Sequence, residues 1–289
     1  MTERDAQAFI YQGEKLQNLP TRITPPKKVN KLLKRQVRRI SKHQVTLFAE
    51  DAQSLLVVFQ AMDCAGKDST IKNVFTGVNP QGIHVANFKA PTKKELSHGY
   101  MWRHWQELPR RGMIGVFNRS HYEEALVMRV HPEYFAGRKL QAPALDDQFW
   151  HTRLADLADF EAHLGRNGTH VLKFYLHLSK LEQARRLLAR IERPHKNWKF
   201  NGGDMVERQF WEQYRFAYDE ALAATHTADC PWYVIPADDK PTMRAIVAGI
   251  IADKMAAMNM QFPVLEDDDV EDMRAAEKEL RAELQAAEN

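Results

Sequence analysis

An apolar stretch that runs directly into a short polar turn, at residues 54–74, limits the possible folds of this chain more than any other feature. Residues 55–59 are apolar without alternation, which is typical of a strand buried on both faces of a parallel sheet. The spacing of apolar residues after the turn predicts a helix. A strand, a tight loop and a helix N-terminus form a site for phosphate, because backbone N–H groups and the helix dipole both favour anions there.

The expected phosphate loop differs from the standard Walker A pattern, which begins with Gly and has Ser or Thr after the Lys. Those two positions hold Ala61 and Asp68. A carboxylate inside such a loop repels phosphate unless a cation lies between them, so we interpret Asp63 as an organiser of magnesium. The alternative for Asp63 is a helix N-cap or a turn residue. The loop residues expected to hold phosphate are Ala65, Gly66, Lys67, Asp68 and Ser69.

The sequence argues against a membrane-spanning protein and against a secreted protein held together by disulfides. No apolar run approaches the roughly 20 residues that span a bilayer, and the N-terminus lacks the basic-then-apolar layout of a signal peptide. The only cysteines are Cys64 and Cys230, too few for a disulfide framework. We therefore expect a globular cytoplasmic protein that does not associate with membranes.

Charge is unevenly distributed along the chain. Residues 15–49 contain ten Lys and Arg and no acidic residue, whereas residues 266–289 contain ten acidic and three basic residues. Both segments are open to a plain interpretation as solvated helix faces. The functional alternative is a positive field that gathers a polyanion, with an acidic tail that restrains this field or contacts another subunit.

Alternating patterns predict one α/β domain with a parallel sheet. Thr92 and Glu95 predict a capping box that begins a helix reaching about residue 108, Ser179 is expected to cap a helix at 181–193, and Asp204 one reaching about residue 224. Further helices are expected at 28–51, 146–168 and 240–260, and further strands at 83–88, 113–117, 169–178 and 232–236. Ligands of such sheets bind beyond the carboxyl ends of the strands. Polar clusters follow three of these strands, at residues 63–68, 87–89 and 118–122.

The basic helix at 181–193 and the cationic, aromatic segment after it predict a mobile lid over phosphates, at about residues 181–203. The alternative is that its arginines form the wet face of an amphipathic helix. The buried side would then consist of Leu181, Ala184, Leu187, Leu188 and Ile191. Trp198 and Phe200 are open to interpretation as nucleobase contacts or as packing at the hinge.

Six segments, taken together and in order, resemble the second polyphosphate kinase family, whose members have a three-layer P-loop kinase fold like that of thymidylate kinase. They are AMDCAGKDSTIK (61–72), GVNPQG (77–82), FKAPT (88–92), FNRSHYEE (117–124), RIERPHKNWKF (190–200) and VIPADDK (234–240). The short chain is most similar to the single-domain subgroup, class III, that phosphorylates both AMP and ADP. The resemblance implies a kinase domain at 28–262, preceded by an irregular segment at 1–27 and followed by an acidic helical tail at 263–289.

The resemblance also implies roles for individual residues. Asp63 and Lys67 match the family's Walker A positions, and Arg119 matches an arginine that contacts phosphate. Asn118 stands where many members have Asp, which shifts the main role in binding metal to Asp63. Arg185 and Arg190 lie at the positions of the lid arginines. Residues expected to bind nucleotide or polyphosphate are Asn87, Phe88, Lys89, Asn118, Arg119, Tyr122 and Arg129.

The implied reaction is magnesium-dependent phosphoryl transfer between inorganic polyphosphate and AMP or ADP, with Mn²⁺ as a substitute metal and GMP or GDP as further acceptors. The family also implies a homo-oligomer, either a dimer or a homotetramer. Two alternatives are an ATP-dependent nucleoside monophosphate kinase, which shares the loop and lid, and a non-catalytic binder of nucleic acid that uses residues 15–49. We expect no nucleic-acid partner, because the chain lacks an aromatic stacking platform.

Overall fold

The centre of the molecule is a five-stranded parallel sheet with the strand order β2-β3-β1-β4-β5. The computed structural model describes residues 6–138 and 144–288. All seven residues of β1 are buried, as its uninterrupted apolar sequence predicts. The strands are β1 (Ser54–Gln60), β2 (Ile83–Asn87), β3 (Ile114–Asn118), β4 (Thr169–His177) and β5 (Trp232–Pro236).

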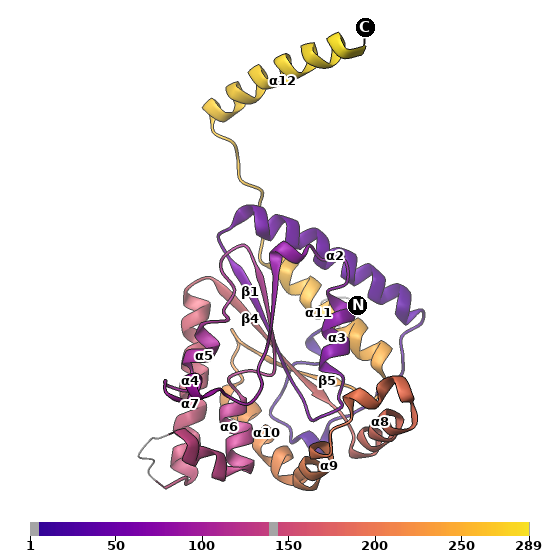
Figure 1. Ribbon diagram of the computed structural model, residues 1–289, viewed down its shortest axis with the longest axis vertical. Helices are drawn as coiled ribbons and strands as arrows, with labels where there is room; N and C mark the ends of the chain where they lie inside the picture. Colours follow the sequence, from indigo (N-terminus) through magenta and orange to yellow (C-terminus); the bar gives the residue numbers. More distant parts are fainter. Residues whose placement is uncertain (1–5, 139–143, 289) are drawn as a thin grey trace.

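Helices cover both faces of this sheet and give the expected three layers (Figure 1). One face carries α2 (Val29–Glu50), α3 (Lys67–Val74) and α11 (Lys240–Ala257), and the other carries α6 (Glu123–Val130), α7 (Asp147–Arg166) and α10 (Trp211–Thr225). The shorter helices are α4 (Lys93–Leu96), α5 (Trp102–Trp105), α8 (Lys180–Glu192) and α9 (Gly203–Glu207), with 3₁₀ turns η1 (Leu16–Asn18), η2 (Pro80–Gly82), η3 (Pro132–Arg138), η4 (Pro194–Lys199) and η5 (Arg208–Phe210).

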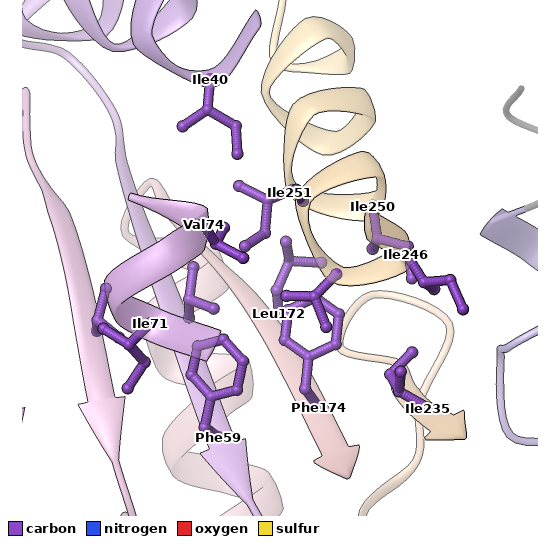
Figure 2. Close-up of a cluster of buried hydrophobic side chains, with 14 of the residues drawn as sticks. Ile40, Phe59, Ile71, Val74, Leu172, Phe174, Ile235, Ile246, Ile250 and Ile251 are labelled. Carbon is purple, nitrogen blue, oxygen red and sulfur yellow. The ribbon is translucent and has the colours of Figure 1, made fainter. Parts of the chain in front are cut away.

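The core on the α2, α3 and α11 side is built from aliphatic side chains and a pair of phenylalanines (Figure 2). Ile40 of α2 and Ile251 of α11 point toward the strands, where Phe59 and Phe174 stack with ring centroids 5.3 Å apart. Burial of this surface fixes α3 against β1. The turn between these two elements is therefore held at both ends by the core.

Sequence signals for helix starts are confirmed at two positions. Thr92 and Glu95 form the capping box, and Ser179 accepts a hydrogen bond from the N–H group three residues on, as Asp146 also does at the start of α7. The helix expected to reach residue 108 instead ends at Leu96 and resumes at Trp102, on either side of the helix-breaking Gly99. Asp204 is no cap, because it lies inside α9 and its carboxylate binds an arginine instead.

The two ends of the chain differ in how they meet the body. Residues 6–28 form no long element, yet Leu16 is fully buried, its N–H donates to Asp219 Oδ1 (2.7 Å), and Ile10 bridges Tyr233 at the edge of β5. By contrast, α12 (Asp267–Glu288) projects away from the body and has no buried side chain (Figure 1). The irregular segment expected at 1–27 and the acidic tail expected at 263–289 each extend beyond the described residues, by residues 1–5 and by residue 289. In the described part of the chain, no helix is long and apolar enough to cross a bilayer.

Candidate active site

The polar residues at the carboxyl ends of β1, β2 and β3 lie close together. Asn118 pairs in register with Asn87 of β2 and with Phe59 of β1, so the three strands end at the same level. Its Nδ2 donates to Asn87 Oδ1 (2.7 Å) and to Asp68 Oδ1 (2.8 Å). The predicted convergence of polar clusters at the carboxyl edge of the sheet is confirmed. The side-chain amide of Asn118 is the donor in both contacts and therefore joins β2 and α3 to the end of β3.

The turn between β1 and α3 has the shape of a phosphate loop. Cys64 (φ 67°) and Gly66 (φ 107°) adopt left-handed conformations, which bring the chain sharply into the N-terminus of α3. A Cβ on Gly66 would also lie 3.3 Å from Ser69 Oγ, so glycine suits this position on both grounds. Lys67 folds back over the loop, with its Nζ 3.0 Å from the carbonyl oxygen of Ala61. Burial lowers the pKa of Lys67, because desolvation disfavours its charged form.

Asp63 and Arg119 face each other across this loop. Arg119 Nη2 lies 3.1 Å from Asp63 Oδ1, and the left-handed backbone of Arg119 (φ 63°) points its side chain back toward β1. The carboxylates of Glu123 and then Asp63 raise the pKa of the Arg119 guanidinium. A fixed cation and an anion side by side, next to a phosphate loop, can bind a phosphate and a metal ion in adjacent positions.

Arg186 holds the phosphate loop in place, a role that the sequence reasoning did not identify. Its Nη1 donates to the carbonyls of Cys64 (3.2 Å) and Ala65 (2.7 Å), and its Nη2 donates to that of Ala237 (2.6 Å). From the same helix, Gln183 Nε2 donates to the carbonyl of Asp63 (3.0 Å). These bonds turn loop carbonyls away from the site. The i, i+4 pair that Arg186 forms with Glu182 was the one available signal in the sequence.

The face of α8 that meets the loop differs from the predicted one. Gln183, Arg186 and Leu187 are buried, whereas Leu181, Leu188 and Ile191 are 62%, 53% and 52% exposed. The cause is that the loop carbonyls need hydrogen-bond donors, which the polar face of α8 supplies and its apolar face does not.

The two expected lid arginines differ in their surroundings, since only Arg190 binds a residue of the cavity lining, Asp204. Arg190 Nη1 is bonded to Asp204 Oδ2 (2.7 Å), whose pKa is raised by burial and by the nearby Asp63. Arg185 points into solvent with its side chain 64% exposed and 3.7 Å from Glu182. Neighbouring residues of one helix turn point in different directions, so Arg186 faces the loop while Arg185 faces solvent, and the catalytic role of Arg185 stays a prediction.

A cavity of about 590 Å³ opens beside Asp63 and Arg119, between α6 and the helices that follow the lid. Its volume suits a nucleotide-sized ligand. Phe88 and Lys89 line it as expected, while Trp198 and Phe200 do not. Beside Phe88, the wall contains aromatic side chains that the sequence did not indicate, because they come from two distant segments, η3 and α10: Tyr134, Trp211, Tyr214 and Tyr218.

Two predicted ligand contacts fall elsewhere. Tyr122 is fully buried, its hydroxyl lies 2.9 Å from both Glu161 Oε1 and Thr225 Oγ1, and it does not line the cavity. Its aromatic ring belongs to the core beneath the site. Arg129 stacks on Phe216 (4.8 Å to the ring centroid) and does not line the cavity, so its expected ligand contact stays a prediction.

The acidic side chains fit a magnesium ion that also binds substrate. Within the described ranges, no group of three or more His, Cys, Asp and Glu side chains could hold a metal by itself. Asp63 and Asp68, however, place two carboxylates on either side of the loop lysine. Mg²⁺ is typically bound by one or two carboxylates together with substrate phosphates, so these two residues meet its requirements.

A phosphate loop at the centre of a parallel sheet, an Asp–Arg pair and an adjoining cavity define a P-loop phosphotransferase. The family model for polyphosphate kinase 2 matches residues 25–263, and the chain belongs to this family of enzymes. The expected fold and family are thus confirmed.

Similar proteins agree with this assignment. The chain is 44% identical over 270 residues to an ADP-polyphosphate phosphotransferase of Rhodopseudomonas palustris, covering 91% of this chain and 93% of the relative. It is 44% identical over 226 residues to an AMP/ADP-polyphosphate phosphotransferase of Meiothermus ruber, covering 78% and 80%. The crystal structure of polyphosphate kinase 2 from Arthrobacter aurescens matches with a TM-score of 0.86, at 35% identity, over 96% of both chains.

Proposed function

We propose that this enzyme transfers phosphoryl groups between inorganic polyphosphate and adenine nucleotides, converting AMP to ADP and ADP to ATP. One observation carries the proposal: the phosphate loop and the nucleotide-sized cavity share a wall, formed by Asp63 and Arg119. A phosphate chain on the loop and a nucleotide in the cavity would meet at this wall. Two relatives named for polyphosphate phosphotransfer, to ADP and to AMP/ADP, support the choice of substrates.

Positioning and charge stabilisation account for most of the catalysis that phosphoryl transfer needs. Lys67 and the N–H groups at the start of α3 hold the phosphates of the donor. Arg119 lies between the two substrates and binds the phosphoryl group as it moves. Arg190 adds positive charge from the lid side once a phosphate competes for it with Asp204. No general base is needed, because the attacking oxygen belongs to a phosphate that is already anionic.

We propose Mg²⁺ as the metal, with Mn²⁺ as a substitute, held by Asp63 and Asp68 and by the carbonyl oxygen of Asn118. When bound, the ion neutralises charge on the phosphates that flank the transferred group. The protein's part is to fix these oxygens: Asn118 positions Asp68 through its side-chain amide, and Arg119 positions Asp63.

Three broader assignments belong to the proposal. GMP and GDP are further acceptors, as the resemblance to the family implies, and the cavity places apolar and aromatic side chains beside polar ones such as Gln183 and Arg208. A homo-oligomer, either a dimer or a homotetramer, is supported by the exposed apolar stripe of Leu181, Leu188 and Ile191. A cytoplasmic location is supported by the unpaired state of Cys64 and Cys230.

The test is turnover of AMP and of ADP with long-chain polyphosphate as sole phosphoryl donor, with and without Mg²⁺. The proposed function predicts ADP and ATP as products. If products form only when ATP is supplied, a conventional nucleoside monophosphate kinase would be favoured. Lys67→Met should abolish transfer, with Lys72→Met as its control, because Lys72 is exposed on the same helix. Full activity of Lys67→Met would refute the role assigned to this lysine, whereas no turnover by the wild-type protein together with polyanion binding would favour a non-catalytic binder.

A further inference from the structure

A second group of cations lies against the outer side of the phosphate loop. Lys240 is the first residue of α11 and Arg244 follows one turn later, while Lys196 belongs to η4. Lys240 Cε lies 3.8 Å from the position that a Cβ on Gly66 would occupy, so its side chain touches the loop directly. None of these three side chains lines the nucleotide-sized cavity. They therefore form a group of cations separate from the lining of the cavity.

Acidic side chains near this group are bound to other donors. Asp238 accepts from the Ser179 N–H (2.9 Å) and the Thr21 hydroxyl (2.9 Å), and Asp239 accepts from the Thr242 N–H (3.0 Å). Glu182 binds Arg186 at 2.9 Å.

The cations themselves have no counter-ion in the parts of the chain that the structure describes. Across residues 6–138 and 144–288, the side chains of Lys196, Lys240 and Arg244 form no ion pair or hydrogen bond. Arg244 Nε is buried without a partner. Burial, followed by the charges of Arg186, Arg244 and Lys196, lowers the pKa of Lys240 to about 8. The cluster is thus a concentration of unneutralised positive charge.

The position of Lys240 adds a second unfavourable contribution. The N-terminus of a helix carries partial positive charge and favours anions, yet the first turn of α11 contains no acidic residue. A lysine at its first position repels both the helix dipole and the neighbouring cations. A bound phosphate chain would reverse each of these repulsions at once.

We propose that Lys240, Arg244 and Lys196 bind phosphates of the polyphosphate chain that lie beyond those held by the phosphate loop. This proposal rests on the proposed function, because it assigns the loop to the polyphosphate donor and the cavity to the nucleotide. A chain leaving the loop away from the cavity meets Lys240 first. The subsite serves long donors: a short chain ends on the loop before it reaches the cluster.

The test compares Lys240→Gln/Arg244→Gln with Lys254→Gln, a matched control on the same helix. Lys254 is similarly part-buried but lies in the last turn of α11, at the far end from the loop. For each protein, KM is measured for long-chain polyphosphate, for tripolyphosphate and for AMP. Calorimetric titration with long-chain polyphosphate alone reports binding without turnover.

In the double variant, we expect KM and Kd for the long chain to rise about tenfold, equivalent to roughly 1.4 kcal/mol, with a smaller effect on kcat. Its KM values for tripolyphosphate and AMP should match those of the control. The salt dependence of long-chain binding should also weaken, because fewer counterions are exchanged. The single variants Lys240→Gln and Arg244→Gln should each show part of the effect, and they provide the test if the double variant fails to fold.

An unchanged long-chain Kd would overturn the proposal, as would equal losses for short and long chains. A raised KM for AMP alone would assign the cluster to the nucleotide and would also overturn it. Failure of the proposed function looks different: the wild-type enzyme would then not turn over with polyphosphate at all, while the calorimetric comparison would still show whether the cluster binds the polymer.

Discussion

Replacing Arg186 with glutamine should damage both stability and catalysis, whereas the same change at Arg185 should affect neither strongly. Arg186 donates to the carbonyl oxygens of Cys64, Ala65, Ala237 and Asp238, and its Nε binds Glu182 at 2.9 Å. Arg186 is 8% exposed, whereas the Arg185 side chain is 64% exposed. The pair thus compares a buried anchor with a solvated neighbour of the same charge.

The magnitude follows from the partners that Arg186→Gln leaves behind. A hydrogen bond to a charged group is worth about 1.5–3 kcal/mol, and removing one member of a buried ionic contact costs about 3–5 kcal/mol. Glutamine recovers one or two of the contacts, so we expect the free energy of unfolding to fall by about 3 kcal/mol. A domain stable by roughly 5–15 kcal/mol would still fold.

Catalysis should suffer through the position of the loop. Without Arg186, the carbonyls of residues 64 and 65 can turn toward the phosphates, and a displacement of about 1 Å at a reacting centre can cost about 10²-fold in rate. We therefore expect kcat/KM for polyphosphate to fall about a hundredfold. Arg186→Lys should be intermediate, because an ammonium group cannot reproduce the planar fork of a guanidinium.

Urea unfolding followed by circular dichroism measures the first effect, and initial rates of ADP formation measure the second. Arg185→Gln should change stability by less than about 0.5 kcal/mol, as is usual for an exposed ion pair. The reverse order, with Arg185→Gln inactive and Arg186→Gln stable and active, would refute the assignment of the loop anchor. Such a result would support Arg185 as a catalytic lid arginine.

Three further predictions concern single sites. Lys67→Met should lower kcat by about 10³-fold or more, measured by single-turnover transfer, with an unchanged unfolding midpoint. Lys173→Met should lower the free energy of unfolding by about 3–5 kcal/mol, because Glu161 then loses its partner at 2.6 Å in a site where both side chains are at most 1% exposed. A double-mutant cycle with Glu161→Leu should show strong coupling between the two residues. Additive losses of stability would contradict this prediction. Since the pKa of Lys240 is lowered to about 8, its charge is present below that pH and lost above it. KM for long polyphosphate should therefore rise as pH increases beyond 8, and Lys240→Arg should flatten the profile; identical profiles would exclude this lysine as the cause.

The sequence predicts the parts of the site that depend on local pattern. A run of apolar residues fixes β1, and the chemistry of Gly66 and Lys67 fixes the loop, so strand, loop and helix are all where expected. The meeting of Asn87 and Asn118 follows from parallel strand ends at one edge of the sheet.

The rest of the site depends on long-range contacts that no local pattern carries. The periodicity of α8 predicts an apolar face turned inward, but hydrogen bonding by the loop carbonyls overrides it. Tyr122 follows Arg119 closely, and only the packing of β4 and α7 shows that it belongs to a buried network with Glu161 and Lys173. The cavity wall has the same character, since Tyr134 and Trp211 are far apart in the chain.

The attachment of α8 to the phosphate loop has a consequence for how substrates reach the cleft. Gln183 and Arg186 donate hydrogen bonds from this helix to the carbonyls of residues 63–65. An outward movement of α8 alone would break these hydrogen bonds. Helix and loop should therefore travel as one rigid unit. The opposite rim of the cavity has exposed side chains, among them Lys89 and the half-exposed Tyr134. We expect the nucleotide to enter and leave past these two residues while the phosphate chain stays bound at the phosphate loop.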